Sequence, residues 1–169
     1  MKKIKLLLIS LFCIFAFPNL VSAASGKINV TGTSTVVVGN NVTVTVTLSS
    51  STPIGSWEMS LNYDKNYLQL RSTNSESNST RMAASSSTGI KSKSYTFTFK
   101  TLKKGNTKVT VDSYLAYAFD DLSQISLTSS SKSINIITQA ELEASYSKNN
   151  NLSSLGIEGF TLSPEFKAD

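Results

Sequence analysis

Histidine is absent from this chain of 169 residues, and cysteine occurs once, at Cys13. The lack of histidine removes the commonest general base, the commonest zinc ligand and the central member of a Ser-His-Asp triad. Cys13 follows Phe12, where a lipoprotein signal needs a small residue, so we expect no lipid attachment there. Cleavage after Ala23 would leave no cysteine, which excludes disulfides, thiolate metal sites and thiol nucleophiles from the mature protein.

Charged side chains are also scarce, at 16% of the residues, with 16 Lys and Arg against 11 Asp and Glu. Three of the lysines, Lys2, Lys3 and Lys5, belong to the N-terminal segment, which leaves 13 basic residues and a net charge of +2. No basic run or patch remains of the kind that nucleic-acid binding requires. We therefore expect no nucleic-acid partner.

The N-terminus has the three parts of a secretory signal peptide. A lysine-rich start over residues 1–5 is followed by an apolar stretch over residues 6–17 and by the small-residue ending Val21-Ser22-Ala23. The apolar stretch is shorter than the about 20 residues that cross a bilayer. We therefore predict a signal peptide over residues 1–23, no transmembrane segment in the mature chain, and a secreted or cell-surface location.

Apolar and polar residues alternate through most of residues 27–137, and this period of two predicts an all-β chain. The pattern is clearest over residues 41–48, where valines alternate with threonines after a turn at Gly39-Asn40. A further strand is predicted over residues 56–63, with Trp57 on its apolar side. β-branched residues favour a half-buried pleated surface, which supports the assignment.

The remaining segments complete the predicted sheet pattern. Residues 71–94 are rich in Ser, Thr and Asn, and we expect a long loop there with at most one short strand near residues 81–84. Residues 95–102 and 107–111 are predicted to form a hairpin across a polar turn, and short strands close the fold at residues 125–127 and 133–137. Many short strands without a helical period favour an antiparallel β-sandwich over residues 24–138.

The chain changes character after residue 138. Residues 139–146 are the only helix-like stretch, and a polar run follows, so we interpret residues 139–150 as a linker. Residues 151–169 resemble the start of a cadherin-like β-sandwich repeat, of which only about a fifth is present by ordinary domain sizes. We expect the sequence to be a fragment of a longer surface protein or a truncated reading frame.

Several stretches, taken in order, resemble a cohesin domain. They are Val38-Gly39-Asn40-Asn41-Val42-Thr43-Val44, Ile54-Gly55-Ser56-Trp57-Glu58-Met59-Ser60-Leu61-Asn62-Tyr63-Asp64, Tyr95-Thr96-Phe97-Thr98-Phe99-Lys100, the turn at Gly105, and Asp120-Asp121-Leu122. The resemblance implies a nine-stranded sandwich of jelly-roll topology that binds a calcium-loaded dockerin module. It also implies a role in assembling polysaccharide-degrading complexes, and a fold close to that of carbohydrate-binding modules.

The resemblance also implies a site. Polar residues of the strand over residues 56–63 and a position near the closing strands would contact the partner, which is a dockerin-like module or another cell-surface protein. The partner-binding residues carried over or sharing that face are Ser56, Glu58, Ser60, Asn62 and Gln124. The same pattern also describes the ordinary wet face of an antiparallel strand.

Three other residue groups have a functional and a structural interpretation. Tyr114, Tyr117 and Phe119 form either an exposed glycan-binding platform or a cap on the end of the sandwich. Asp120-Asp121, with Asp112 nearby, lacks calcium-loop spacing and favours a solvated turn, so no metal or cofactor is expected. Trp57 could stack on a sugar, but its alternation favours the core.

A binding module is therefore the leading hypothesis, and we predict no enzymatic activity. A paired-carboxylate glycosidase built on Glu58 and Asp120 would need a cleft that a small sandwich rarely offers. The alternatives that stay open are direct carbohydrate binding and a structural spacer within a surface adhesin.

Overall fold

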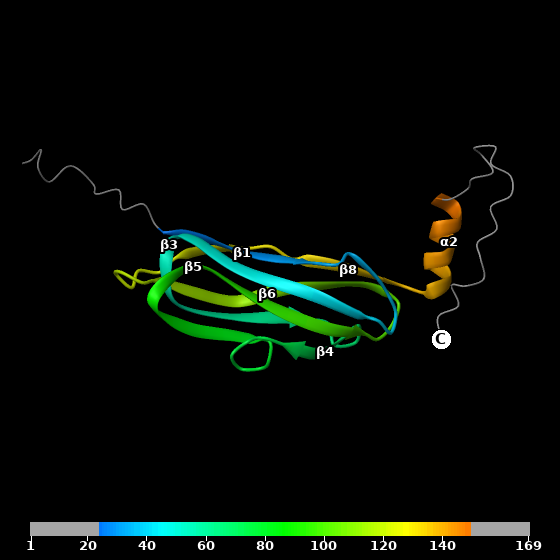
Figure 1. Ribbon diagram of the computed structural model, residues 1–169, viewed down its shortest axis with the longest axis horizontal. Helices are drawn as coiled ribbons and strands as arrows, with labels where there is room; N and C mark the ends of the chain where they lie inside the picture. Colours follow the sequence, from blue (N-terminus) through cyan, green and yellow to red (C-terminus); the bar gives the residue numbers. More distant parts are fainter. Residues whose placement is uncertain (1–23, 150–169) are drawn as a thin grey trace, which may run out of the picture.

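The computed structural model describes residues 24–149, which form eight strands and one helix (Figure 1). The predicted signal peptide over residues 1–23 and the predicted second domain over residues 151–169 lie outside the described residues. The elements are β1 (Ser25–Gly32), β2 (Thr35–Val37), β3 (Asn41–Tyr63), β4 (Leu68–Thr73), β5 (Arg81–Thr101), β6 (Gly105–Ala118), β7 (Ser126–Ser129), β8 (Lys132–Ile137) and α2 (Gln139–Asn149).

The strands form two layers that share the long strands β3 and β5. In the first layer, β1 and the C-terminal part of β5 flank the N-terminal part of β3, and β7 and β4 lie outside them. In the second layer, the N-terminal part of β5 and β6 flank the C-terminal part of β3, followed by β8 and β2. The predicted all-β sandwich is therefore confirmed, and among the strands of residues 24–149 the parallel pairs are β1–β7 and β2–β8.

Strand β3 bends from one layer into the other near Pro53. Its pairing with β5 shifts in register between Ser49 and Ser56, and its pairing with β6 shifts between Ile54 and Ser56. The two predicted strands over residues 41–48 and 56–63 are therefore one bent strand. Because β3 and β5 each serve both layers, the described part of the chain has eight strands where the resemblance implied nine.

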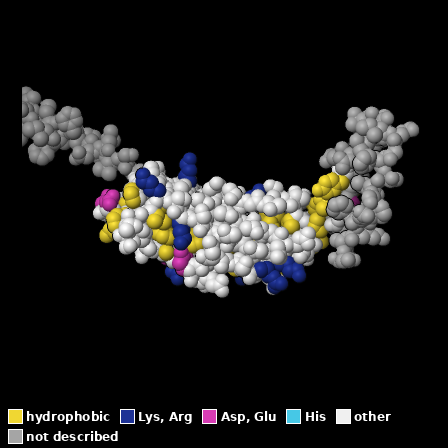
Figure 2. Space-filling model, viewed as in Figure 1, with side chains coloured by type: hydrophobic (Ala, Val, Ile, Leu, Met, Phe, Trp, Pro, Cys, Tyr) yellow, Lys and Arg dark blue, Asp and Glu magenta, His cyan; other side chains and the backbone are white. Residues whose placement is uncertain are grey.

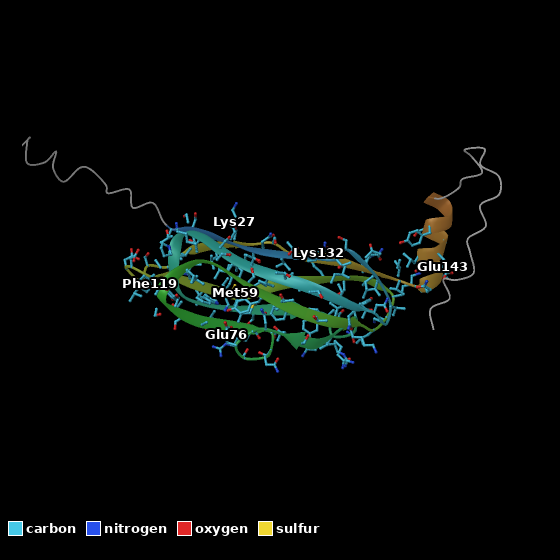
Figure 3. The ribbon with its side chains drawn as sticks, viewed as in Figure 1. Lys27, Met59, Glu76, Phe119, Lys132 and Glu143 are labelled. Atoms are coloured by element: carbon cyan, nitrogen blue, oxygen red, sulfur yellow. The ribbon has the colours of Figure 1, made fainter. Side chains whose placement is uncertain are left out.

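The interior between the layers is filled by the predicted alternating residues. The first-layer part of β3 buries Val42, Val44, Val46 and Leu48, and its second-layer part buries Trp57 and Met59 in the same core. Met59 lies inside the sandwich in Figure 3. Tyr95, Phe97 and Phe99 of β5 are fully buried and fill the centre. Burying this set of large apolar side chains is the main stabilising contribution to the fold.

The predicted long loop over residues 71–94 is wrong. β4 continues to Thr73 and β5 begins at Arg81, so only residues 74–80 connect them. Met82 and Ala84 face the core opposite Met59 and Trp57 of β3. The segment needs few large apolar residues because the neighbouring side chains of Met59 and Trp57 on β3 fill the core there.

The predicted hairpin between residues 95–102 and 107–111 is also wrong. β5 pairs with β3 and β4, whereas β6 pairs with β3 and β8, so the polar turn connects the two layers. Gly105 ends this turn at a φ of +141°, and a Cβ there would lie 2.7 Å from the ring of Tyr67. A short polar connection can join two paired strands of a hairpin or two strands in different layers. The pairing of β5 with β4 and of β6 with β8 shows that it joins the two layers here.

The predicted helix-like stretch is confirmed as α2, which stands at the end of the sandwich opposite the start of β1 (Figure 1). Thr138 and Glu141 form a reciprocal capping box: the Thr138 amide donates to Glu141 Oε2 at 2.9 Å, and the Glu141 amide donates to Thr138 Oγ1 at 3.2 Å. Lys104 adds an ion pair to Glu141 from the turn before β6. None of the described helices is long and apolar enough to cross a membrane.

Candidate partner-binding face

The second layer has an outer face on which the predicted partner contacts meet. On β3, Ser56 lies opposite Tyr117 of β6, and Glu58 lies opposite Leu115. Gln124 reaches the same place from the chain that leaves β6, because it forms an isolated β-bridge with Tyr117. We call the surface formed by Ser56, Glu58, Leu115, Tyr117 and Gln124 the partner face.

A bulge in β6 puts the apolar residues of this face in contact with solvent. Between the pairs Glu58–Leu115 and Ser60–Asp112 the register slips, and Ser113 adopts a φ of +50°. Before the bulge the inward residues of β6 have odd numbers, and after it Tyr114, Ala116 and Ala118 face inward. An uninterrupted strand would have buried Leu115 and Tyr117, so the bulge creates the exposed strip.

The exposed strip runs toward one end of the sandwich. Leu115 is 45% exposed, Tyr117 38% and Phe119 36%. Phe119 lies at the end opposite α2 (Figure 3). Most of the described surface in the same view consists of backbone and of side chains that are neither hydrophobic nor charged (Figure 2). Contiguous exposed side chains of this size on a largely polar protein mark a contact surface for a partner.

The predicted glycan platform is divided between the two faces of β6. Tyr114 is half-buried and packs against the core, whereas Tyr117 and Phe119 point outward. Trp57 is only 6% exposed and donates its indole Nε1–H to the Tyr95 hydroxyl at 2.7 Å, so it belongs to the core as predicted. Ser56, Trp57, Glu58, Leu115 and Tyr117 line a hollow of about 190 Å³.

An ion pair borders the partner face on the side of β5. Arg81 approaches Glu58 Oε1 with both Nε and Nη2, each at 2.9 Å. Both side chains are more than half exposed, so this pair contributes little to stability. It holds one carboxylate and one guanidinium side by side next to an apolar strip, which suits a partner that carries both apolar and charged groups.

The other two predicted contacts, Ser60 and Asn62, lie farther along the same strand. Asn62 donates through Nδ2 to Asp112 Oδ2 at 2.7 Å, and Thr110 donates to Asp112 Oδ1 at 3.2 Å. Ser60 pairs in register with Arg81 and Asp112. The structure therefore places all four predicted residues of β3 on one outward face, in a polar part beside Asp112 and an apolar part beside Leu115.

A hydrogen-bonded chain supports the partner face from inside. The Tyr95 hydroxyl accepts from Trp57 and donates to Glu76 Oε1 at 3.0 Å, and Lys93 pairs with the same oxygen at 3.2 Å. Burial raises the pKa of the Tyr95 hydroxyl, and the neighbouring Glu76 carboxylate raises it further. Burial alone would raise the pKa of Glu76, but hydrogen bonds from its own backbone, Tyr95 and Lys93 lower it.

The acidic segment after β6 forms a turn, as the sequence favoured. Asp121 Oδ1 accepts from the Ser123 amide at 3.0 Å and from the Ser123 hydroxyl at 2.7 Å. These bonds, the amide foremost, lower the pKa of Asp121. Asp112 is engaged with Asn62 instead. Within residues 24–149, no group of three or more His, Cys, Asp or Glu side chains is placed to hold a metal ion.

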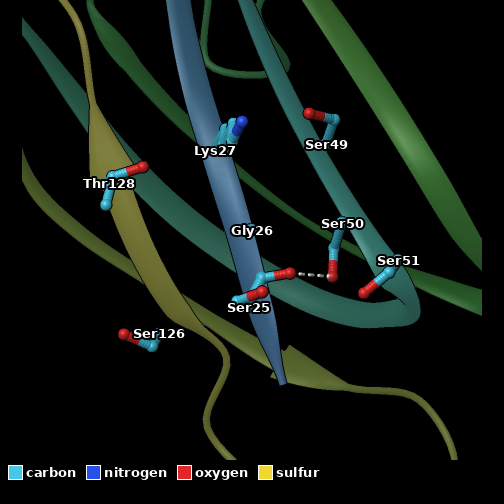
Figure 4. A pocket seen from close by; sticks show the side chains of 8 residues that line it. All are labelled: Ser25, Gly26, Lys27, Ser49, Ser50, Ser51, Ser126 and Thr128. Carbon is cyan, nitrogen blue, oxygen red and sulfur yellow. Dashed lines mark hydrogen bonds between the residues drawn. The ribbon is translucent and has the colours of Figure 1, made fainter. Parts of the chain in front are cut away.

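A wider hollow of about 530 Å³ lies on the first layer (Figure 4). Its walls carry hydroxyl groups and one amino group, without aromatic or large apolar side chains, from Ser25, Gly26, Lys27, Ser49, Ser50, Ser51, Ser126 and Thr128. The Ser50 hydroxyl donates to the Ser25 carbonyl across it at 3.0 Å. It lacks the apolar contacts that give a binding site its affinity.

The sequence pattern did not indicate Leu115 of the partner face or Arg81 at its border. Leu115 is two residues before Tyr117 and four before Phe119, so alternation along a strand would have predicted that it faces the same side as they do. Arg81 lies in the segment that the sequence predicts as a loop, so its pairing with Glu58 could not be anticipated.

Comparison with known proteins supports the fold. No curated protein matches the chain. Among solved structures, a non-cellulosomal cohesin from the hyperthermophilic archaeon Archaeoglobus fulgidus superposes with a TM-score of 0.58 at 16% identity, covering 73% of this chain and 99% of that one. Type II cohesin A11 from Bacteroides cellulosolvens gives a TM-score of 0.52 at 12% identity, covering 66% and 99%.

A third similar structure is a type II cohesin–X-dockerin complex from Acetivibrio cellulolyticus, with a TM-score of 0.50 at 14% identity, covering 67% of this chain and 100% of that one. Identities this low establish similarity of fold alone. The family model of the cohesin domain, in contrast, matches residues 26–118, which is more than half of the sequence. On the strength of that match, this chain belongs to the cohesin domain family.

Proposed function

We propose that this chain is an extracellular, non-catalytic module that binds a dockerin-type protein module through the partner face. The observation that carries the proposal is the exposed strip of Leu115 and Tyr117 beside the Glu58–Arg81 ion pair. Protein interfaces draw most of their affinity from a few exposed aromatic and arginine side chains at their centre. A cohesin in complex with an X-dockerin is among the similar structures, which supports this class of partner.

The context of the module follows from the sequence. A signal peptide over residues 1–23 would deliver the protein to the medium or the cell surface, where residues 24–138 act as the binding domain. Residues 139–150 would connect this domain to a following β-sandwich repeat. The assembly is then a polysaccharide-degrading complex or a surface structure, and the first similar structure is described as non-cellulosomal.

The test is capture of secreted proteins on the immobilised protein, with and without calcium, followed by titration of each identified dockerin-bearing protein. Tyr117→Ala and Glu58→Arg are expected to weaken that binding at least tenfold, because hot-spot truncation costs about 2 kcal/mol or more. Both side chains are exposed, so the fold should be retained. Thr128→Arg on β7, in the other layer, is the matched control.

Failure to capture any dockerin-bearing protein would overturn this proposal. Equal binding by Tyr117→Ala and the control would keep a dockerin partner but move the site elsewhere.

Direct carbohydrate binding is the second candidate, because Tyr117 and Phe119 offer two aromatic side chains on one edge of the partner face. Aromatic faces stack on sugar rings through their apolar surface. Retention on a glycan array that is lost in Tyr117→Ala would support it. No retention on any glycan, together with no protein partner, would leave a spacer role in a surface adhesin.

A further inference from the structure

The N-terminal part of β5 is a free edge of the second layer. It pairs with β3 on one side, and among the described residues no strand pairs with its other side. The Leu61 amide donates to the Thr80 carbonyl at 2.9 Å, so residue 80 directs its backbone groups toward β3. Because backbone direction alternates along an antiparallel strand, Arg81, Ala83 and Ser85 direct theirs away from β3.

The hydrogen bonds of the Arg81 backbone confirm that its amide and carbonyl point away from β3. Its amide donates to Ser79 Oγ at 3.2 Å, and its carbonyl accepts from the Ser77 hydroxyl at 2.6 Å, so the loop before β5 satisfies both outward groups. No hydrogen bond within residues 24–149 engages the outward amides and carbonyls of Ala83 and Ser85. Two consecutive outward positions of the strand are therefore available to another chain.

Only the part of this edge after Ser85 carries one of the usual protections against pairing, an irregularity in its register with β3 between Ser85 and Ile90. Natural edge strands carry lysines, prolines or bulges, or are very short. β2 and β7 are three and four residues long, and β4 carries Arg71. Residues 82–90 read Met-Ala-Ala-Ser-Ser-Ser-Thr-Gly-Ile, with no charge and no proline. The small side chains of Ala83 and Ser85 also leave room for a neighbouring backbone.

We infer that a second copy of this chain pairs with the β5 edge as an antiparallel strand about a two-fold axis at Ala84. In that register Ala83 and Ser85 of one copy lie opposite Ser85 and Ala83 of the other, which forms four backbone hydrogen bonds. Arg81 lies just beyond the paired residues, and the residues that follow Ser85 in the other copy are uncharged as far as Ile90, so no like charges meet. An uncharged edge of small residues is complementary to itself, and a copy of the same strand is therefore its natural occupant.

The pairing has a geometric consequence that goes beyond the proposed function. A two-fold axis perpendicular to the sheet keeps the outer faces of both copies on the same side. The two partner faces then belong to one continuous sheet, and each remains uncovered. The dimer would present two binding faces side by side to a surface with repeated ligands.

The test is sedimentation velocity of the purified protein over a range of concentrations, with substitutions at the edge. Ser85→Lys is expected to raise the dimer dissociation constant at least tenfold, because it places two lysines across the axis. The Ser85 side chain is exposed and its amide is unbonded, so the fold should not change. Thr128→Lys on the β7 edge should leave the dissociation constant unchanged.

A charge-complementation experiment makes the result specific. A mixture of Ser85→Lys and Ser85→Glu proteins is expected to form mixed dimers more tightly than either protein forms dimers alone. A wild-type protein that stays monomeric at the highest soluble concentration would overturn the proposal. So would a dimer that Ser85→Lys and Thr128→Lys weaken equally, or one that the mixture fails to restore.

Discussion

Removal of one buried hydroxyl group, in Tyr95→Phe, should destabilise the sandwich measurably. The Tyr95 hydroxyl is the acceptor for Trp57 Nε1 at 2.7 Å, and Trp57 is only 6% exposed. Phenylalanine keeps the ring packing but leaves the indole N–H without a partner. An unsatisfied buried donor costs about 1 to 3 kcal/mol, so we expect the free energy of unfolding to fall by about that amount.

The assay is urea unfolding followed by tryptophan fluorescence, which reports on Trp57 because it is the only tryptophan of the chain. The denaturation midpoint should fall while its slope stays constant, because the same surface is exposed on unfolding. Tyr63→Phe is the matched control: Tyr63 packs on Phe99 at 4.7 Å between ring centres, and its hydroxyl has no hydrogen bond among the described residues. If both variants lose equal stability, the indole hydrogen bond is not the cause.

Glu76 makes the stability contributed by the hydrogen bonds among Trp57, Tyr95 and Glu76 dependent on pH. The pKa of Glu76 is lowered from 4.5 in the folded protein, so its contribution to stability is complete above pH 4.5 and is lost as the pH falls through the lower folded value. The difference in unfolding free energy between wild type and Glu76→Gln should therefore shrink as the pH is lowered below 4.5. A difference that grows on acidification would contradict the assignment.

Two further substitutions test local features of the fold. Gly55→Ala should lower the unfolding free energy by about 1 to 3 kcal/mol, because its Cβ would lie 2.9 Å from the backbone Cα of Phe119; an unchanged urea midpoint would refute the close approach. Thr138→Ala should speed amide exchange in α2 by roughly fivefold, since an N-cap threonine contributes about 1 kcal/mol, and should leave the β-strand amides unaffected. Lys104 and then the Thr138 amide lower the pKa of Glu141 to about 2. Glu141 should therefore keep stabilising the start of α2 as the pH falls from 4.5 and should lose this effect only near that value, as followed by amide chemical shifts.

Local alternation predicted most of the interior. The valines of residues 42–46, Trp57 and Phe97 are buried because a strand with a period of two puts such residues on one side, whatever its partner. The resemblance to cohesins placed Ser56, Glu58 and Gln124 together, and the structure brings them to one face. The helix after residue 138 was also predictable, and Thr138 and Glu141 have the Thr-x-x-Glu spacing of a capping box.

The errors concern pairing between segments far apart in the sequence. The serine-rich strand around Ala83 resembles a loop when it is considered alone, because Trp57 and Met59 on its neighbour supply the apolar bulk. The connection before Gly105 resembles a hairpin turn, but β6 pairs with β3 and β8 instead of β5. In both cases the missing information is the identity of the neighbouring strand.

The sequence by itself therefore determined the class of the fold, the family, and the inward residues of the strands that alternate without a bulge. Only the tertiary structure decided the apolar part of the proposed partner face and the open strand edge. The bulge at Ser113 reverses the inward side of β6 and exposes Leu115 and Tyr117, and the layer order leaves the edge at Ala83 and Ser85 open. Alternation is a property of a single strand, whereas a bulge and a free edge exist only in relation to the strands that lie beside them.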